Sequence, residues 1–541
     1  MLLLWAYPIR AEKQQIVRVA DFGAIPDDGI DDTAAIQRAV AACGPGATLV
    51  FEKGTYDLLP KEGSRRPGYI GILLEGLKNF TIEGNGATLA MGSAGPSATF
   101  RAENCQNLTI RNMNFKTSEQ THLGGYVTAT GDNYIDVRPT GPYIPREDVV
   151  EAVFGFDPQN MCLSGERLDV YQLRENMKAR VMENGDLRVF LKNKIAMPRK
   201  ELAVVVRYRA YGSACLSISH STDVTLSGLN IYSVSGMGVI MDYCEDMVIK
   251  DCKVMIEPGS GLWLSANSDA THFKNCRGKI EISDCSFENM GDDAVNIHNF
   301  YSRVIGVVSP DSFTLDLNTR RITMPRVGDV LEIGTPDRGM VAVDSVVVKS
   351  IQTLDGGKLL ITTQRKLPKK FGKDYVVGNA TCTPRAIIRN CIVRGNRARG
   401  FLIQTRDVIV QGCTFDRCSA AAIHVTADVG YWCEGISTRN VTICDNKILG
   451  CNFSAASGAG AINIFASNGM FNDPAANETT PVHRNITISN NLFDDNMGYC
   501  INVSAAENVK ITDNHVISMD KGFVNICEGV RGVEIKENTM P

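Results

Sequence analysis

Apolar and polar residues alternate in short segments throughout the chain, and one pattern recurs along most of its length. Copies include "VTLSGLNI" (224–231), "MVIKDCKV" (247–254), "IEISDCSF" (280–287) and "ITISNNLF" (486–493). Several intervals between the second apolar residues of successive copies are 22 to 24 residues long. These aligned residues are Leu226, Ile249, Ile282, Ile388, Val410, Ile443, Ile488, Ile511 and Ile535.

A second alternating segment follows within most copies, as in "GVIMDY", "AVNIHN", "GFLIQT", "AAIHVT" and "CINVSA". Two short strands per unit of about two dozen residues are typical of a parallel β-helix, in which each coil packs its inward face against its neighbours. A β-propeller needs units of about 40 residues or more. The sequence therefore predicts an all-β fold built on a right-handed parallel β-helix.

The repeat also explains where the cysteines lie. The chain has 17 of them, an odd number and a lower density than in a disulfide scaffold. One repeat position is occupied first by cysteines and then by asparagines, namely Cys252, Cys285, Cys391, Cys413, Asn446, Asn491, Asn514 and Asn538. Side chains at one position stack from coil to coil, Cys as a small apolar group and Asn as a hydrogen-bonded ladder. We therefore interpret these cysteines as structural thiols, neither metal ligands nor nucleophiles.

Other segments precede or interrupt the repeat. The stretch from 17 to 43 predicts a short strand, an acidic turn and an amphipathic helix from Asp32 or Thr33 that covers the open end of the core. The acidic "DDGIDD" (27–32) could bind calcium, but helix capping explains it without a further ligand. Two gaps, at 116–213 and 301–384, are rich in alternating segments and predict two inserted β-barrel-like domains.

The predicted order of domains is a possible truncated leader (1–15), a cap with the first coils (16–115), the first insertion (116–213), coils (214–300), the second insertion (301–384) and the last coils (385–541). The leader, "MLLLWAYPIRAEKQQ", has an apolar core without a positively charged start. A signal cleaved after Ala11 would imply a secreted or periplasmic protein, and a disordered leader is the alternative.

Charge and hydropathy limit the possible partners. The formal net charge of −4 argues against a surface that wraps nucleic acid or a strongly acidic polysaccharide, since both favour a basic face. No apolar run reaches 18 residues, so we expect no membrane span. Oligomeric state cannot be read from the pattern.

The candidate chemistry begins in "FENMGDDAVNIHNF" (287–300), where Asp292 and Asp293 stand side by side before a strand. Asp269, in "SANSDATHF", precedes Asp292 by 23 residues, which is one coil of about 4.8 Å. Three carboxylates then share one patch, and crowding favours keeping one of them protonated. Hydrolysis of a glycosidic bond needs such a pair of one acid and one ionised carboxylate. The alternative is an acid cluster neutralised by lysines or by bound calcium.

Further polar and aromatic residues fall near this patch. Aligning Phe401 with Val295 puts Arg399 in the column of Asp293, where it could hold a sugar hydroxyl or tune the acids. Trp263 and Trp432 could stack on sugar rings, although a core or interface position is equally consistent with each. The other candidates for substrate binding are His272, His298, Gln404, His424 and Glu434. A hydrogen-bonded structural role is the alternative for each histidine.

The combination of "NSDATHF", "MGDDAVNIHNF", "GNRARGFLIQT" and the two insertions resembles glycoside hydrolase family 110 over nearly the whole chain. This resemblance implies an α-1,3-galactosidase of the β-helix fold that acts at non-reducing ends, including blood group B structures, with inversion. It also implies Asp292 as the general acid, with Asp269 and Asp293 positioning and deprotonating water. No cofactor and no metal are implied, and the partners are glycans with terminal α-galactosyl groups.

The pectin-cleaving hydrolases of family 28 use a similar arrangement of one Asp and then two. In this chain no Gly-His-Gly follows the acid pair, and no Arg-x-Lys triplet lies nearby to bind a uronate carboxylate. Three alternatives remain from the sequence: a polygalacturonase-like hydrolase, a β-helical polysaccharide lyase or epimerase, and a non-catalytic carbohydrate-binding solenoid. A lyase or epimerase would use calcium or basic residues at the cleavage subsite.

Overall fold

The structure is a computed structural model. It describes residues 15–59, 69–92, 97–166, 168–171, 177–191, 198–208, 214–319, 321–336, 338–430, 432–454, 459–467 and 480–541. The proposed leader up to residue 14 lies outside the described residues, so the predicted signal stays a prediction. The only α-helix in these ranges, α1 (Thr33–Ala41), is too short to span a membrane.

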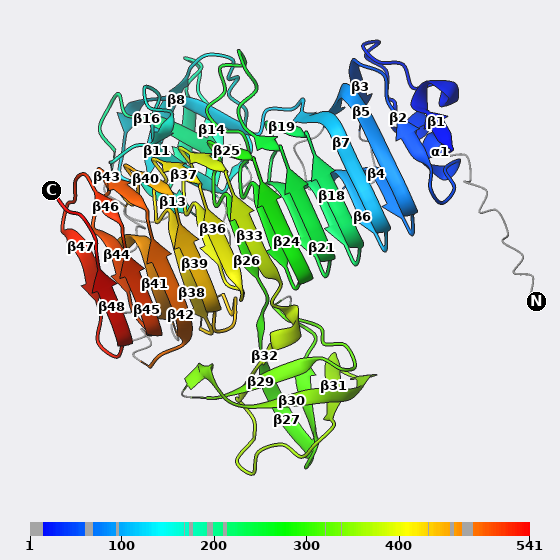
Figure 1. Ribbon diagram of the computed structural model, residues 1–541. Coiled ribbons are helices and arrows are strands. Elements are labelled where there is room, and N and C mark those ends of the chain that lie inside the picture. Colours follow the sequence, from blue (N-terminus) through cyan, green and yellow to red (C-terminus); the bar gives the residue numbers. More distant parts are fainter. Residues whose placement is uncertain are drawn as a thin grey trace, which may run out of the picture.

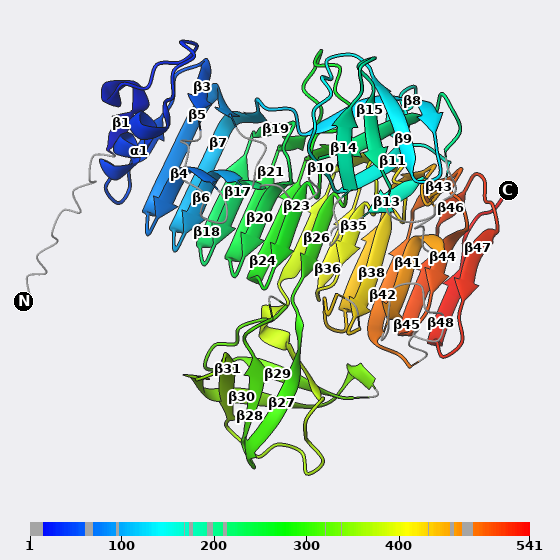
Figure 2. The same cartoon turned by 180° about the vertical axis from the view of Figure 1, so that it is seen from behind.

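The chain forms a right-handed parallel β-helix, as the repeat predicts. Figures 1 and 2 show the coils stacked in sequence order, with α1 at one end and the C-terminus at the other. In the described part, one face is an 11-stranded parallel sheet. Its strands are β4 (Tyr69–Glu75), β6 (Ser97–Glu103), β17 (Ala214–Ser219), β20 (Met237–Asp242), β23 (Thr271–Lys274), β26 (Val295–His298), β35 (Phe401–Ile403), β38 (Ile423–Asp428), β41 (Gly460–Ser467), β44 (Tyr499–Val503) and β47 (Gly522–Ile526).

A 22-stranded sheet makes the rest of the coil walls within the same ranges. Its strands are β1 (Ile16–Arg18), β2 (Thr48–Val50), β3 (Thr55–Leu58), β5 (Lys78–Met91), β7 (Gln106–Thr117), β18 (Thr222–Ser227), β19 (Asn230–Tyr232), β21 (Glu245–Lys250), β22 (Lys253–Val254), β24 (Arg277–Ser283), β25 (Ser286–Glu288), β33 (Arg385–Arg389), β34 (Ile392–Arg394), β36 (Val408–Gln411), β37 (Thr414–Asp416), β39 (Arg439–Cys444), β40 (Lys447–Leu449), β42 (His483–Ser489), β43 (Leu492–Asp494), β45 (Ala506–Thr512), β46 (His515–Val516) and β48 (Arg531–Lys536).

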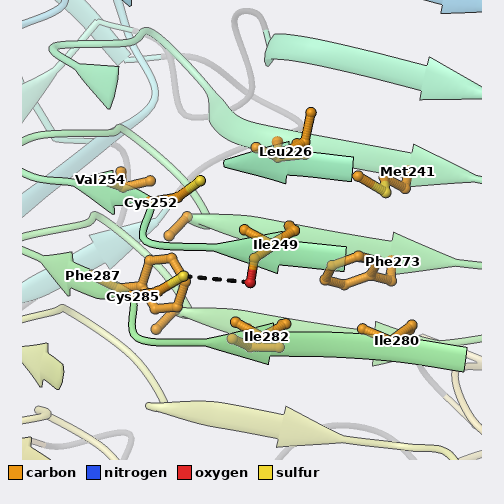
Figure 3. Close-up of a cluster of buried hydrophobic side chains, with 14 of the residues drawn as sticks. Leu226, Met241, Ile249, Cys252, Val254, Phe273, Ile280, Ile282, Cys285 and Phe287 are labelled. Carbon is orange, nitrogen blue, oxygen red and sulfur yellow. Dashed lines mark hydrogen bonds between the residues drawn. The ribbon is translucent and has the colours of Figure 1, made fainter. Parts of the chain in front are cut away.

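The core runs along the axis of the β-helix, where the repeated apolar residues stack. Leu226, Ile249 and Ile282 are buried neighbours in one column, because β18, β21 and β24 pair in parallel register. Figure 3 shows this stack facing Met241 and Phe273 from the opposite sheet. The period of the sequence therefore corresponds to a coil, and burial of this column stabilises it.

The column of cysteines and asparagines lies inside the turns. Asn446, Asn491 and Asn514 are buried, and each donates from Nδ2 to the Oδ1 of the next Asn at 2.9 Å. Cys285 is also buried, and its thiol donates to the carbonyl of Ile249 (Figure 3). All 17 cysteines lie in the described part of the chain, and none forms a disulfide. The interpretation of this column as structural is confirmed.

Helix α1 covers the first coil, and it begins at Thr33 as predicted. Asp31 Oδ1 accepts a hydrogen bond from the backbone N–H of Thr33. Asp32 is buried and accepts from the backbone N–H groups of Ile25 and Asp57. The acidic turn therefore ties the cap to the first coil through backbone donors.

The first insertion is an antiparallel sheet between β7 and β17, nine-stranded in the ranges the structure covers. It contains β8 (His122–Thr130), β9 (Tyr134–Pro139), β10 (Val149–Val150), β11 (Ala152–Asp157), β12 (Cys162–Leu163), β13 (Asp169–Tyr171), β14 (Met177–Val181), β15 (Leu187–Phe190) and β16 (Ala203–Arg207). Its core includes Trp263 and Leu264 of the β-helix, so the sheet packs directly on a coil.

The second insertion follows β26 and is a closed barrel. It contains β27 (Tyr301–Ser309), β28 (Ser312–Asp316), β29 (Val330–Thr335), β30 (Arg338–Leu354), β31 (Lys358–Thr363) and β32 (Val376–Asn379). A buried pair joins it to the β-helix, because Arg277 donates to both oxygens of Asp329 at 2.6 Å. The two insertions project from opposite edges of the coils (Figures 1 and 2).

Candidate active site

The three predicted acids meet at the edge of the 11-stranded sheet where β23, β26 and β35 begin. Thr271 pairs with Val295 and Val295 with Phe401, so Asp269, Asp293 and Arg399 each stand two residues before a strand in one column. Asp269, Asp292 and Asp293 are 3%, 8% and 1% exposed. One oxygen from each carboxyl group lies within 4.8 Å of the other two.

Guanidinium groups supply positive charge to this cluster. Arg399 donates from Nη2 to Asp293 Oδ2 at 2.8 Å and from its backbone N–H to Asp293 Oδ1 at 2.9 Å. Arg397 Nη1 lies 3.8 Å from Asp292 Oδ1. Because the chain itself brings cations to the acids, the arrangement resembles a hydrolytic site more than a metal cage.

Burial and mutual repulsion set the protonation of the acids. Removal from water, followed by the charge of Asp292, raises the pKa of Asp269 well above its usual range. Burial raises the pKa of Asp293 as well, and Arg399 opposes this shift. The cluster therefore favours a state in which at least one proton is retained.

Two histidines extend the cluster away from Asp269. His272 Nδ1 lies 2.6 Å from Asp269 Oδ2, and His272 Nε2 lies 2.9 Å from His298 Nε2. The two rings meet edge to face with their centroids 4.9 Å apart. Burial lowers the pKa of His272 to about 4 and that of His298 well below its usual range.

Glu434 adds a fourth carboxyl group beside the histidines, with Oε1 4.0 Å from His298 Nε2. Burial raises the pKa of Glu434 to about 7. Gln404 is buried, and it follows Ile403, the register partner of Ile297, so it stands next to His298. The predicted residues of three successive coils are therefore neighbours.

His424 lies further along the same sheet. It pairs in register with Leu402 and contacts Asn463 through Nδ1 at 3.2 Å. Burial, followed by the charge of Arg399, lowers the pKa of His424 to about 3. This histidine is therefore a neutral member of the face that carries the acids.

Of the two positions that the sequence allows for Trp263, the structure shows the interface and not an exposed sugar-binding surface, so its prediction as a substrate-binding residue is corrected. It is 7% exposed and stacks on Phe156 of the first insertion at 5.0 Å, with the rings 14° from parallel. A Cβ at Gly124 would collide with its ring, so the inserted sheet lies against the indole. Trp432, in contrast, is only half-buried, with the Arg321 guanidinium 5.1 Å from its ring centroid.

Sequence reasoning missed two arginines that position the acid-bearing loops. Arg207, fully buried at the end of β16, donates from Nη1 to the carbonyl oxygens of Asn267 and Gly291. Arg397 donates from Nε to Asp169 of the same insertion at 3.0 Å. The only signal for Arg207 is one charged residue at the end of the apolar run "AVVV".

The comparisons with known proteins point to carbohydrate chemistry. The family described as glycosyl hydrolases family 28 matches residues 212–309, which include all three acids, and the right handed beta helix region matches 375–540. An alpha-1,3-galactosidase B of Bacteroides thetaiotaomicron is 28% identical over 91% of this chain and 84% of its own. An alpha-1,3-galactosidase A of Bacteroides fragilis is 26% identical over 89% and 84%.

The chain is a glycosidase related to these enzymes. The resemblance to glycoside hydrolase family 110 is thereby confirmed. Among solved structures, the glycosidase is similar to the A-module of an Azotobacter vinelandii mannuronan C-5 epimerase (12% identity, TM-score 0.44, 95% of this chain and 99% of that chain). It is also similar to a Yersinia enterocolitica family 28 exopolygalacturonase (12% identity, TM-score 0.39, 97% and 78%).

Proposed function

We propose that this glycosidase removes terminal α-1,3-linked galactose from branched blood group B or linear Galα1-3Gal glycans, with inversion. The observation that carries the proposal is the buried cluster of three acids and Arg399, in a chain related along most of its length to proteins named alpha-1,3-galactosidase. An uncharged terminal sugar fits a site whose guanidinium groups already face aspartates.

The proposed roles follow the geometry of the acids. Asp292, the most exposed of the three, acts as the general acid that protonates the glycosidic oxygen. Asp269 and Asp293 hold the attacking water, and one of them accepts its proton. Arg399 stabilises the negative charge of Asp293 through a charge-assisted hydrogen bond.

The contacts of Asp269 and Asp293 support inversion. The short spacing of the acid oxygens, within 4.8 Å, is nearer the ~5 Å of retaining enzymes than the ~6.5–9.5 Å of inverting ones. A retaining enzyme, however, needs a carboxylate that can move to the anomeric carbon, whereas a base needs only one lone pair facing the water. Both oxygens of Asp293 accept from Arg399, and Asp269 Oδ2 is held by His272. We therefore assign these acids to water rather than to a covalent intermediate.

A polar cleft of about 380 Å³ lies on the same 11-stranded sheet and is the proposed site for the rest of the glycan. Its lining includes Asp242 and Lys274, which form an ion pair at 3.1 Å. Lys274 ends β23, the strand that begins two residues after Asp269, so the cleft reaches the coil that carries Asp269. This surface offers hydroxyl groups both donors and acceptors.

Galactose release from Galα1-3Gal, with and without α-1,2-fucose on the inner galactose, tests the proposal. We expect release by the native chain and a loss of about 10²–10⁴-fold in kcat for Asp292→Asn, because the general acid is removed. Asp284→Asn is the matched control, since Asp284 is exposed and has a positive φ that Asn accepts. Full activity of Asp292→Asn would contradict the proposal.

A further inference from the structure

Asp269, His272 and His298 form a continuous chain of hydrogen bonds whose directions fix how many protons it holds. His298 Nδ1 lies 3.1 Å from the carbonyl oxygen of Asn299. At the other ring nitrogen, His298 Nε2 faces His272 Nε2 at 2.9 Å, and His272 Nδ1 faces Asp269 Oδ2 at 2.6 Å. The side chains of His298, Asp269 and His272 are 1%, 5% and 11% exposed, so water competes little for these bonds.

The contact between His298 and the carbonyl oxygen of Asn299 determines which nitrogen atoms carry hydrogen. A carbonyl oxygen only accepts, so His298 Nδ1 carries a hydrogen. A neutral His298 then has a lone pair on Nε2, and His272 Nε2 must donate to it. His272 in turn either accepts the proton of a neutral Asp269 or is an imidazolium that donates to ionised Asp269.

One further arrangement satisfies all the bonds. If His298 is the imidazolium, it donates from Nε2 to His272, and His272 donates from Nδ1 to ionised Asp269. Each arrangement contains the same number of protons, one more than an ionised aspartate and two neutral imidazoles. Without that proton, two lone pairs face each other at 2.9 Å or a buried polar group loses its partner, which is unfavourable.

We propose, building on the function proposed above, that His272 and His298 are positioning residues. Together with Asp269 they retain one proton within this series of hydrogen bonds. Asp269 is then unable to act as a free base, and Asp293 is the carboxylate that accepts a proton from water. The spacing of Asp269 and Asp293 does not show which of them is the base. This proposal gives that role to Asp293 and leaves Asp269 to hold the water.

The surroundings support this location of the proton. The charged groups that face the chain are Asp242, Lys274, Asp292, Asp293, Arg399 and Glu434. Burial raises the pKa of Asp269 and lowers the pKa values of both histidines, which favours the proton on Asp269. Asp293 accepts two N–H bonds from Arg399, which favour its ionised form.

The reaction step balances with these assignments. Asp292 gives its proton to the glycosidic oxygen while the bond from that oxygen to the anomeric carbon breaks. The water oxygen bonds to the same carbon, and Asp293 takes the proton that water releases. Asp269 contributes Oδ1, which already accepts from the backbone N–H of Asp293 and can hold the water without removing its proton.

Nitrogen-15 NMR of the full chain, labelled at its seven histidines, tests the proposal directly. Variants His272→Gln and His298→Gln assign the signals, and His515→Gln, at an exposed site, is the control. We expect His272 at neutral pH to be protonated on Nε2, or one ring of the pair to be an imidazolium. Two neutral rings with His272 protonated only on Nδ1 would overturn the proposal. The readout needs no substrate, so failure of the galactosidase assay would not affect it.

The pH dependence of His298→Phe gives a second test. Phe removes the lone pair that forces His272 Nε2 to donate, so Asp269 can ionise while accepting from His272 Nδ1. We expect the alkaline limb of kcat/KM to move to higher pH, because the extra negative charge on Asp269 disfavours loss of the proton from the general acid. A profile parallel to that of the native chain and lowered uniformly would indicate a purely structural role and contradict the proposal.

Discussion

Arg399 is the residue on which the charge of the acid cluster depends most. Its Nη2 contacts Asp293 at 2.8 Å, and its charge lowers the pKa values of both Asp293 and Asp269 against the effect of burial. No other guanidinium in the described part of the chain forms an ion pair with Asp293. The cluster therefore relies on this side chain to keep one carboxylate ionised.

Arg399→Met should reduce kcat/KM by about 10- to 100-fold, since a hydrogen bond to a charged group contributes roughly 1.5–3 kcal/mol. The remaining acids should also hold protons more tightly, so the acid limb of the pH profile should move to higher pH. Arg389→Met is the matched control, because Arg389 is half exposed and pairs with Glu281 on the 22-stranded sheet, whereas the acids lie at the edge of the 11-stranded sheet. A variant profile identical to that of the native chain would contradict this role.

At this scale the sequence predicts positions in a column but not side-chain contacts. The coil period is enough to bring Asp269 and Arg399 beside Asp293, because parallel register repeats with the coil. The contact between His272 and His298 depends on side-chain rotation, and no pattern of residue types indicates it. The part of the site that fixes protonation is therefore visible only in the structure.

At the scale of elements, the asparagine ladder stabilises successive turns. Asn491 Oδ1 accepts from both the backbone N–H and Nδ2 of Asn446, and its own Nδ2 donates to Asn514 and to the carbonyl of Ile443. All of these side-chain atoms are buried. Loss of one member leaves several polar groups without partners.

Asn491→Ala should destabilise the chain by about 3 kcal/mol, because buried donors and acceptors are left unsatisfied. Asn538→Ala, at the half-buried last position of the ladder, should cost clearly less. Thermal unfolding followed by circular dichroism compares the two. An equal Tm for both variants would show that the ladder contributes little.

Substitution of each of the two tryptophans outside the leader should affect a different property, stability for Trp263 and substrate binding for Trp432. Trp263→Ala should cost about 3–5 kcal/mol and lower Tm, because its ring fills the interface with the first insertion. Trp432→Ala, at a half-buried position, should leave Tm nearly unchanged and raise KM if its ring stacks on sugar. The reverse pattern in Tm and KM would contradict these assignments.

The insertions explain why the sequence leaves the position of Trp263 open. Outward positions of a repeat are exposed only where nothing else covers them, and the repeat period carries no information about where an inserted domain packs. The first insertion covers Trp263, and its Arg207 donates hydrogen bonds to the loops that carry Asp269 and Asp292. The existence of both insertions follows from the gaps in the repeat, whereas their contacts do not.

At the scale of the whole molecule, buried neutral histidines link stability to pH. His483 is fully buried, accepts from Thr438 Oγ1 at Nδ1 and donates from Nε2 to the carbonyl of Phe465. Burial lowers its pKa to about 4, from 6.5 in an unfolded chain. The unfolded chain therefore binds this proton first, and the stability that His483 contributes is lost as pH falls from 6.5 to 4.

His483→Gln keeps one donor and one acceptor but does not titrate. The Tm advantage of the native chain over this variant should therefore shrink between pH 6.5 and pH 4. Scanning calorimetry at intervals of half a pH unit measures the difference. A Tm difference independent of pH would show that His483 does not titrate with folding.

The central claim, an inverting α-1,3-galactosidase, is tested most directly by the anomer that is released. Proton NMR of Galα1-3Gal during the first minutes of hydrolysis distinguishes α- from β-galactose before they interconvert. Because Asp269 and Asp293 are held by hydrogen bonds and assigned to water, we predict that β-galactose appears first. Early α-galactose would instead show that one of these carboxylates attacks the sugar, and would contradict the account.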